Sequence, residues 1–92
     1  MMRTIREEQV VSEIVDAARE KYPRLEEVFE GLKWYLSRVP DSAEAEALDD
    51  VNWLYRQDGD AEDKIPAILT IYTFDANYVT LKFIDIKDDP LA

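Results

Sequence analysis

The chain has 92 residues and is acidic, with 11 Lys and Arg against 21 Asp and Glu and a formal net charge of −10 at pH 7. It holds no cysteine and no histidine, which excludes disulfides, a thiolate nucleophile, and the commonest general base and metal ligand. Hydrophobic residues make up 47% of it, as in globular chains, and no apolar run approaches the roughly 20 residues of a membrane span. We therefore expect one cytoplasmic domain over residues 1–92, with no cofactor and no metal.

The negative charge is distributed unevenly along the chain. Residues 1–40 carry seven Lys and Arg and eight Asp and Glu, whereas residues 41–92 carry four and thirteen. Proteins that bind nucleic acid usually neutralise several phosphates with Lys and Arg, so direct binding of nucleic acid is disfavoured. The acidity indicates either simple solubility or a surface presented to a basic protein partner, and both interpretations remain open.

The first predicted helix runs from about Ile5 to Lys21. Thr4, followed three residues later by Glu7, matches a capping box at its start. Residues 1–6 are alternatively a short first strand, and the sequence does not decide between the two. The apolar residues recur at helical spacing and form one stripe, made of Val10, Val11, Ile14, Val15 and Ala18.

A second helix is predicted over residues 24–38. Pro23 suits the first turn of a helix, and Pro40 ends it. Because the joint between the two helices is short, we expect a helical hairpin over about residues 5–39. The apolar stripe of this second helix consists of Leu25, Val28, Phe29, Leu32, Leu36 and Val39.

Gly31 and Trp34 of the second helix lie outside its apolar stripe. Trp34 falls about half a turn from the centre of the stripe, and Gly31 precedes it by one turn on nearly the same side. A glycine inside a helix costs about 1 kcal/mol relative to alanine, so this pair suggests a close contact. The contact is either cover by residues 41–50 or a partner surface, since tryptophan is enriched at interfaces. We predict an interface of Gly31, Trp34 and Arg38, with a homodimer as one form.

The middle of the chain holds one clear strand signal. Residues 41–50 are Ala-rich and acidic, and form either a short helix or a loop. Residues 51–57 alternate as a strand does, and Asp58 and Gly59 then signal a turn. The acidic residues that follow resemble the start of a calcium loop, but Asp63 and Leu69 stand where glycine and glutamate are needed. No metal site is predicted.

Residues 67–86 have the signature of a β-hairpin, with strands over about 67–74 and 79–86. Asn77 is the turn residue best able to adopt a positive φ. Alternation predicts which side chains face the core: Leu69, Ile71, Val79, Leu81 and Phe83. The side chains predicted to face outward include Thr70, Tyr72, Thr80 and Lys82.

No catalytic motif stands out in this chain. It has no Ser-His-Asp set and no two-His metal motif, and two glycines cannot build a Gly-rich phosphate loop. Cleavage of a phosphodiester without histidine can use Arg, Lys and Tyr. The candidates are Arg56, Tyr72 and Lys82, which either converge on one outward sheet face or are scattered surface residues. Whether the chain is an enzyme stays open, and we favour a non-enzymatic protein.

The predicted fold is α+β, with an N-terminal helical hairpin packed on an antiparallel sheet of three or four strands. A Phe-x-x-Leu…Leu-x-x-x-Pro pattern (Phe29, Leu32, Leu36 and Pro40) precedes three strands that end in the hairpin of residues 67–86. This layout resembles the RelE/ParE superfamily of bacterial toxin–antitoxin toxins, over about residues 5–86.

The resemblance implies ribosome-dependent mRNA cleavage or gyrase inhibition, neutralised by an antitoxin segment that lies along the toxin. The positions that match the family's basic and aromatic sheet residues are Arg56, Tyr72 and Lys82. Family toxins are usually basic, and this chain is not. We therefore expect a toxin-type component, catalytically weakened, that acts through protein contacts. The alternative is a non-enzymatic acidic protein-interaction module.

Overall fold

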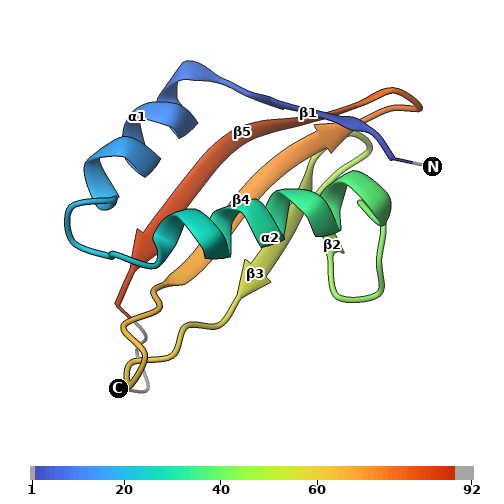
Figure 1. Cartoon of the computed structure of the whole chain (residues 1–92). Helices are drawn as coiled ribbons and strands as arrows, with labels where there is room; N and C mark the ends of the chain where they lie inside the picture. The colour runs from blue at the N-terminus through green and yellow to red at the C-terminus, as the bar shows by residue number, and fades with distance from the viewer. Residues whose placement is uncertain (1, 89–92) are drawn as a thin grey trace.

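The structure, a computed structural model that describes residues 2–88, places two helices on one face of a five-stranded sheet (Figure 1). The predicted α+β class, with two helices packed on a sheet, is confirmed. The elements in chain order are β1 (Thr4–Glu7), α1 (Gln9–Ala18), α2 (Leu25–Arg38), β2 (Glu46–Ala47), β3 (Trp53–Gln57), β4 (Ala67–Phe74) and β5 (Tyr78–Lys87).

The sheet is mixed and has the strand order β1-β5-β4-β3-β2. Strand β1 pairs in parallel with β5, and the other three pairings are antiparallel. The prediction of three or four antiparallel strands is therefore wrong in both number and direction. The two additional strands are the short edge strands β1 and β2.

Strand β1 occupies the place where the sequence predicts the start of a helix. Its residues pair with β5, so that Ile5 lies opposite Val79 and packs against the core. The backbone N–H of Glu8 donates to the carbonyl of Leu81, and α1 begins only at Gln9. The predicted capping box of Thr4 is wrong because the free edge of β5 offers backbone partners that a local signal does not include. The alternative of a short first strand is confirmed in kind, but the strand spans Thr4–Glu7 instead of residues 1–6, and residue 1 lies outside the described residues.

The hydrophobic core lies between the two helices and the covered face of the sheet. Helix α2 matches its predicted bounds to within one residue, and its stripe is buried as expected at Leu25, Phe29, Leu32 and Leu36. Val28 is half-buried, and the predicted burial of Val39 is wrong, because this residue follows the end of the helix and is exposed. Fully burying one such side chain stabilises the fold by about 1.5–3 kcal/mol. The remaining members of the core are Val11, Val15, Tyr22, Ile68, Tyr72, Val79, Leu81 and Ile84.

A β-bulge in β5 reverses the alternation of that strand. Ile71 of β4 lies opposite Phe83, but the next residue, Tyr72, lies opposite Leu81, which leaves Lys82 as an extra residue. An extra residue shifts the alternation by one position, so Lys82 and Phe83 both face away from the helices and Ile84 faces the core. The predicted inward position of Phe83 is wrong, since its side chain is 43% exposed.

Strand β4 presents the opposite face from the one predicted. Ile68, Thr70 and Tyr72 are buried beneath the helices, whereas Leu69 and Ile71 face the other way. Alternation shows which residues share a face, but both faces of β4 carry apolar side chains. The hydroxyl of Thr70 donates to the carbonyl of Phe83 over 2.8 Å, and the hydroxyl of Tyr72 donates to the carbonyl of Pro40. These hydrogen bonds offset the free-energy cost of removing both hydroxyl groups from water.

Two connecting segments also differ from the prediction. Glu46 and Ala47, which lie in the segment predicted as a helix or loop, form strand β2 against β3. The turn of the β4–β5 hairpin depends on Asp75, whose Oδ1 accepts hydrogen bonds of 2.8 Å from the N–H groups of Asn77 and Tyr78. Asn77 does not have a positive φ. No helix in the described part of the chain is long and apolar enough to cross a membrane.

Candidate protein-binding surface

The side of α2 that faces away from the sheet carries four exposed residues in one stripe, Glu27, Gly31, Trp34 and Arg38. At 100° per residue these positions fall within an arc of about 60°, almost opposite the buried stripe of the same helix. We call these four residues the outer face of α2. Figure 1 shows this helix lying across the sheet, with no other element in front of it.

Trp34 is the most prominent apolar group on the outer face of α2, with 57% of its side chain exposed. The guanidinium carbon of Arg38 lies 4.3 Å from the centroid of its ring, which is a cation–π contact. Residues 41–50 do not cover Trp34, so the alternative of cover within the chain is wrong. An exposed tryptophan beside an arginine is a typical centre of a protein interface.

Gly31 is open to solvent. Among the described residues, no atom outside its own helix lies within 4 Å of the position that a Cβ would take. The close contact that the sequence suggested is therefore absent within the described chain. The glycine lowers helix stability by about 1 kcal/mol relative to alanine, and no packing among residues 2–88 compensates for the loss. The missing side chain leaves a shallow notch beside Trp34 in which another chain can approach the helix backbone.

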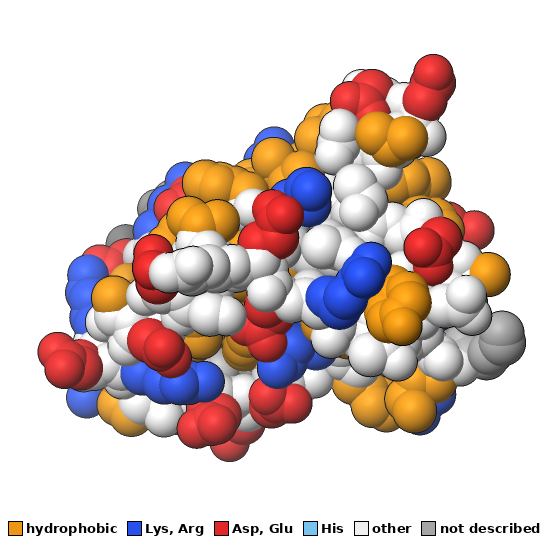
Figure 2. Space-filling model, turned by 90° about the horizontal axis from the view of Figure 1, so that it is seen from above, with side chains coloured by type: hydrophobic (Ala, Val, Ile, Leu, Met, Phe, Trp, Pro, Cys, Tyr) orange, Lys and Arg blue, Asp and Glu red, His pale blue; other side chains and the backbone are white. Residues whose placement is uncertain are grey.

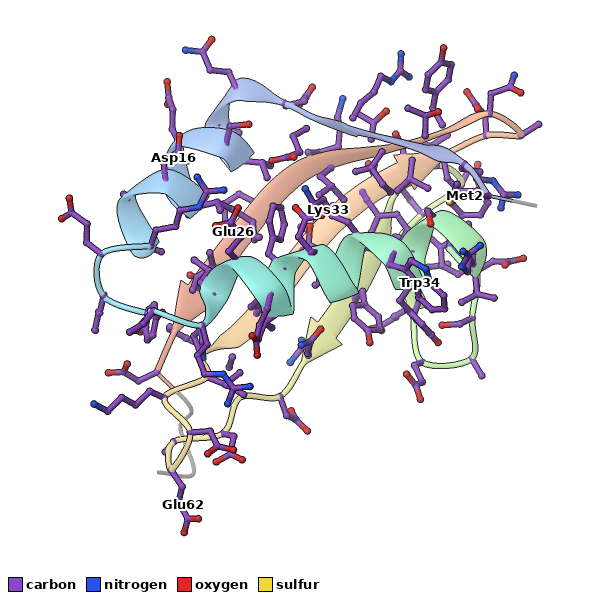
Figure 3. All side chains as sticks on the ribbon, viewed as in Figure 1. Met2, Asp16, Glu26, Lys33, Trp34 and Glu62 are labelled. Atoms are coloured by element: carbon purple, nitrogen blue, oxygen red, sulfur yellow. The ribbon has the colours of Figure 1, made fainter. Side chains whose placement is uncertain are left out.

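A groove of about 400 Å³ adjoins this surface, between α2 and the start of β1. Met2, which is 64% exposed, lies at the same end of the molecule as Trp34 (Figure 3). Together the exposed Met2 and Trp34 widen the apolar surface beyond the helix itself. The groove is lined by Met2, Arg3, Ile5, Glu30, Lys33, Trp34 and Ser37.

Lys33 closes the inner side of this groove and is already paired. Its Nζ lies 2.8 Å from Glu30 and 3.4 Å from Glu7 of β1. Burial lowers the pKa of Lys33, but hydrogen bonds and charges from Glu30 and Glu7 outweigh it, and the net effect is a raised pKa. The lysine is therefore a structural link between α2 and β1 and stays charged at neutral pH.

The outer face of α2 carries charges of both signs. Glu27 accepts a hydrogen bond of 3.0 Å from Nε of Arg24, one turn before it in the chain. Arg38 stands near the other end of the helix, where a cation also interacts well with the helix dipole. Figure 2, which views the molecule from above and not onto this face, shows acidic and basic side chains interspersed with hydrophobic ones there.

Family models, curated proteins and solved structures offer no match to this chain. The functional inference therefore depends on the surface itself.

The three catalytic candidates do not come together. Arg56 and Lys82 lie on the face of the sheet that no helix covers, which we call the open face. Tyr72 lies on the covered face with none of its side chain exposed, and burial raises the pKa of its hydroxyl. Lys82 pairs with Glu8, with 3.2 Å between the nitrogen and the carboxylate oxygen. The predicted outward position of Tyr72 is wrong, and Arg56 and Lys82 lack a third partner.

The open face also carries an apolar cluster that the sequence analysis missed. Leu54 of β3 is only 8% exposed, yet it is separate from the main core, because it lies beside Ile71 on the open face. Leu69 and Phe83 share that face. A signal was present, since β4 is apolar at both alternating sets of positions, which indicates a strand with apolar groups on both faces.

A second groove, of about 620 Å³, lies between α1 and the end of β5. The hydroxyl of Tyr22 donates to Asp88 over 2.7 Å, and Nζ of Lys21 lies 3.5 Å from the same carboxylate. The hydrogen bond from Tyr22, which is the largest cause, and the positive charge of Lys21 hold the pKa of Asp88 below its usual range. Since the groups satisfy one another, they join the segment that follows α1 to the residue that follows β5. Within residues 2–88, no three or more acidic side chains are grouped as metal ligands.

Proposed function

We propose that this chain is an acidic, non-enzymatic protein-interaction domain that binds its partner through the outer face of α2. The observation that carries the proposal is Trp34, which is 57% exposed beside the unfilled notch at Gly31. An exposed tryptophan next to a helix position that costs stability is explained when another protein covers both.

The charge of the molecule supports a protein as the ligand. A net charge of −10 repels nucleic acid, because the 11 Lys and Arg of the chain are outnumbered by 21 Asp and Glu. The groove beside Trp34 is lined by a mixture of apolar and charged side chains. A protein surface with apolar groups and charges of both signs is the ligand that complements this combination.

The proposal is tested by site-specific photocrosslinking in cells of the source organism. A photoreactive aromatic residue replaces Trp34 in one variant and Val10 of α1 in the other. Val10 is the matched control, since it is an apolar residue on the other helix and is 44% exposed. We expect covalent adducts from position 34 and none from position 10. Absence of any adduct at position 34, or equal adducts at both positions, would contradict the proposal.

A toxin-type component of a bacterial toxin–antitoxin system is the second candidate function. It derives from the resemblance to the RelE/ParE superfamily, and the observation that favours it is the packing of two helices on one face of a small sheet. On this hypothesis the apolar open face, with Leu69, Ile71 and Phe83, takes the antitoxin segment. RNA cleavage is not part of it, because Tyr72 is buried away from Arg56 and Lys82.

This second candidate predicts an antitoxin gene beside the gene for this chain, and growth arrest when the chain is expressed alone. Co-expression of that antitoxin should relieve the arrest. Phe83→Ser, on the open face, should prevent this relief, whereas Val10→Ser on α1 should not. A gene without such a neighbour, together with normal growth on expression, counts against the hypothesis.

A further inference from the structure

We propose that the partner of the outer face of α2 is a second copy of this chain, bound as an antiparallel pair of α2 helices about a two-fold axis. This inference rests on the proposed function above, and it names the protein that covers Trp34 and Gly31. It depends on the order of the four side chains along the helix, which makes the surface complementary to itself.

The spacing of Glu27, Gly31, Trp34 and Arg38 is the same when read from either end, with steps of four, three and four residues. An antiparallel pair whose axis passes between Leu32 and Lys33 therefore places each of these residues opposite another member of the set. Trp34 then lies opposite Gly31 of the partner subunit, and Arg38 lies opposite Glu27 of the partner subunit. At 1.5 Å of rise per residue the members of each pair lie at the same height along the helices. No other register matches all four residues.

The apolar contact in this arrangement places the large side chain of Trp34 over the glycine of the other copy, which has no side chain. Trp34 is 57% exposed. In the part of the chain that the structure describes, no atom outside the helix lies within 4 Å of where a Cβ of Gly31 would be. Two copies therefore place two tryptophans into two notches. Helices usually pack 8–10 Å apart, and a glycine at the contact allows the closer end of that range. The exchange gives Gly31 the packing that it lacks within one chain.

The polar contact in this arrangement pairs Arg38 of one copy with the glutamate at position 27 of the other, which are oppositely charged. Arg38 keeps its contact with the Trp34 ring of its own chain and meets a carboxylate of the other chain at the rim. Glu27 already accepts from Arg24 of its own chain, but a carboxylate has acceptor sites for a second donor. In an isologous interface the pair occurs twice. The two chains, each with a charge of −10, otherwise repel, so these local attractions define the orientation.

One helix pair forms a small interface. Helix α2 has 14 residues and is therefore about 21 Å long, and stable dimers usually bury about 800 Å² per partner. We expect a reversible dimer with a Kd on the order of 10–100 µM, and self-repulsion weakens it further at low salt.

The test is a charge-reversal cycle measured by sedimentation of the full chain from about 10 µM to about 1 mM at moderate salt. Trp34→Ala should weaken self-association by at least tenfold. Glu27→Arg and Arg38→Glu should each weaken it by about tenfold, since each places like charges opposite one another twice. The double variant, Glu27→Arg with Arg38→Glu, should return to within about threefold of the parent.

Asp16→Arg and Arg19→Glu on α1 are the matched controls. They alter another exposed pair, 2.6 Å apart and three residues apart like Arg24 and Glu27, and change the net charge equally. They should leave self-association unchanged. A parent chain that stays monomeric at about 1 mM, or a double variant as weak as the single ones, would overturn the antiparallel dimer. Crosslinking from position 34 to a different protein would also overturn it while leaving the proposed function intact, whereas absence of any adduct removes both.

Discussion

The two glycines of this chain differ in whether the surrounding structure requires a glycine. At Gly59 a Cβ would lie 2.5 Å from the carbonyl oxygen of Ile65 and 2.7 Å from the backbone nitrogen of Ala67. The glycine is therefore required by the close approach of two backbone segments. At Gly31 no atom outside the helix interferes, and nothing within the described chain requires a glycine.

The two alanine substitutions should consequently have opposite effects on stability. Gly59→Ala should lower the free energy of unfolding by about 1–3 kcal/mol, because the backbone around Ile65 has to move. Gly31→Ala should raise it by up to about 1 kcal/mol through helix propensity. Denaturant unfolding of both variants in dilute solution measures the two changes. Equal effects at the two positions would contradict the difference in packing.

Asp75 gives a prediction for pH. The N–H groups of Asn77 and Tyr78 hydrogen-bond to its carboxylate and lower its pKa below the usual range. A carboxylate whose pKa is lower in the folded than in the unfolded state stabilises the fold above the unfolded pKa of about 3.9. This contribution is lost as the pH falls through the folded pKa. Asp75→Asn keeps a hydrogen-bond acceptor but removes the charge.

We therefore expect Asp75→Asn to be less stable than the parent near pH 6 and equally stable at a pH below both pKa values. Thermal unfolding over this pH series measures the difference. A gap that stays constant down to the lowest pH would show that the charge of Asp75 is not its cause.

At the scale of one element, β5 shows how a local irregularity decides which side chains are buried. Lys82 is the extra residue of its bulge, so Leu81 and Ile84 both face the core although they are three positions apart. Simple alternation predicts instead that Phe83 is buried and Ile84 is not. The two neighbouring residues therefore test the bulge directly.

Ile84→Ala should lower the free energy of unfolding by about 2–5 kcal/mol, because it leaves a cavity in the core. Phe83→Ala removes a side chain that is 43% exposed, and should cost about 1 kcal/mol although it deletes more atoms. Chemical denaturation measures both. A larger loss for Phe83→Ala than for Ile84→Ala would indicate that β5 continues without a bulge.

At the scale of the whole molecule, the charge of −10 opposes the compact state through self-repulsion. The ion pairs between exposed side chains, such as Arg19 with Asp16, each contribute only about 0–1 kcal/mol. Added salt should therefore reduce the repulsion among the acidic side chains more than it weakens these ion pairs.

We expect the melting temperature to rise when NaCl is increased from about 10 mM to about 300 mM, where the Debye length falls below about 10 Å. Differential scanning calorimetry of the dilute chain measures the shift in melting temperature. Unfolding by urea, an uncharged denaturant, is the control that shows whether the chain unfolds in one cooperative transition. A melting temperature that falls with added NaCl would mean that attractive pairs dominate.

The sequence by itself determined the elements whose signals are local. Helix α2 follows from its apolar stripe between Pro23 and Pro40, and the β4–β5 hairpin follows from two β-branched runs with a polar break. The candidate surface could also be predicted from the sequence, because Trp34 and Gly31 lie outside the apolar stripe that α2 buries.

Only the tertiary structure decided features that need a distant partner. Strand β1 exists because β5 offers a free edge some seventy residues away in the chain, and the two sides of β4 are equally apolar until the helices cover one. Likewise, whether Trp34 is covered depends on where residues 41–50 pass, and within this segment Glu46 and Ala47 form β2 at an edge of the sheet. Local propensity and alternation describe neighbours along the chain, whereas burial depends on which surfaces meet in space.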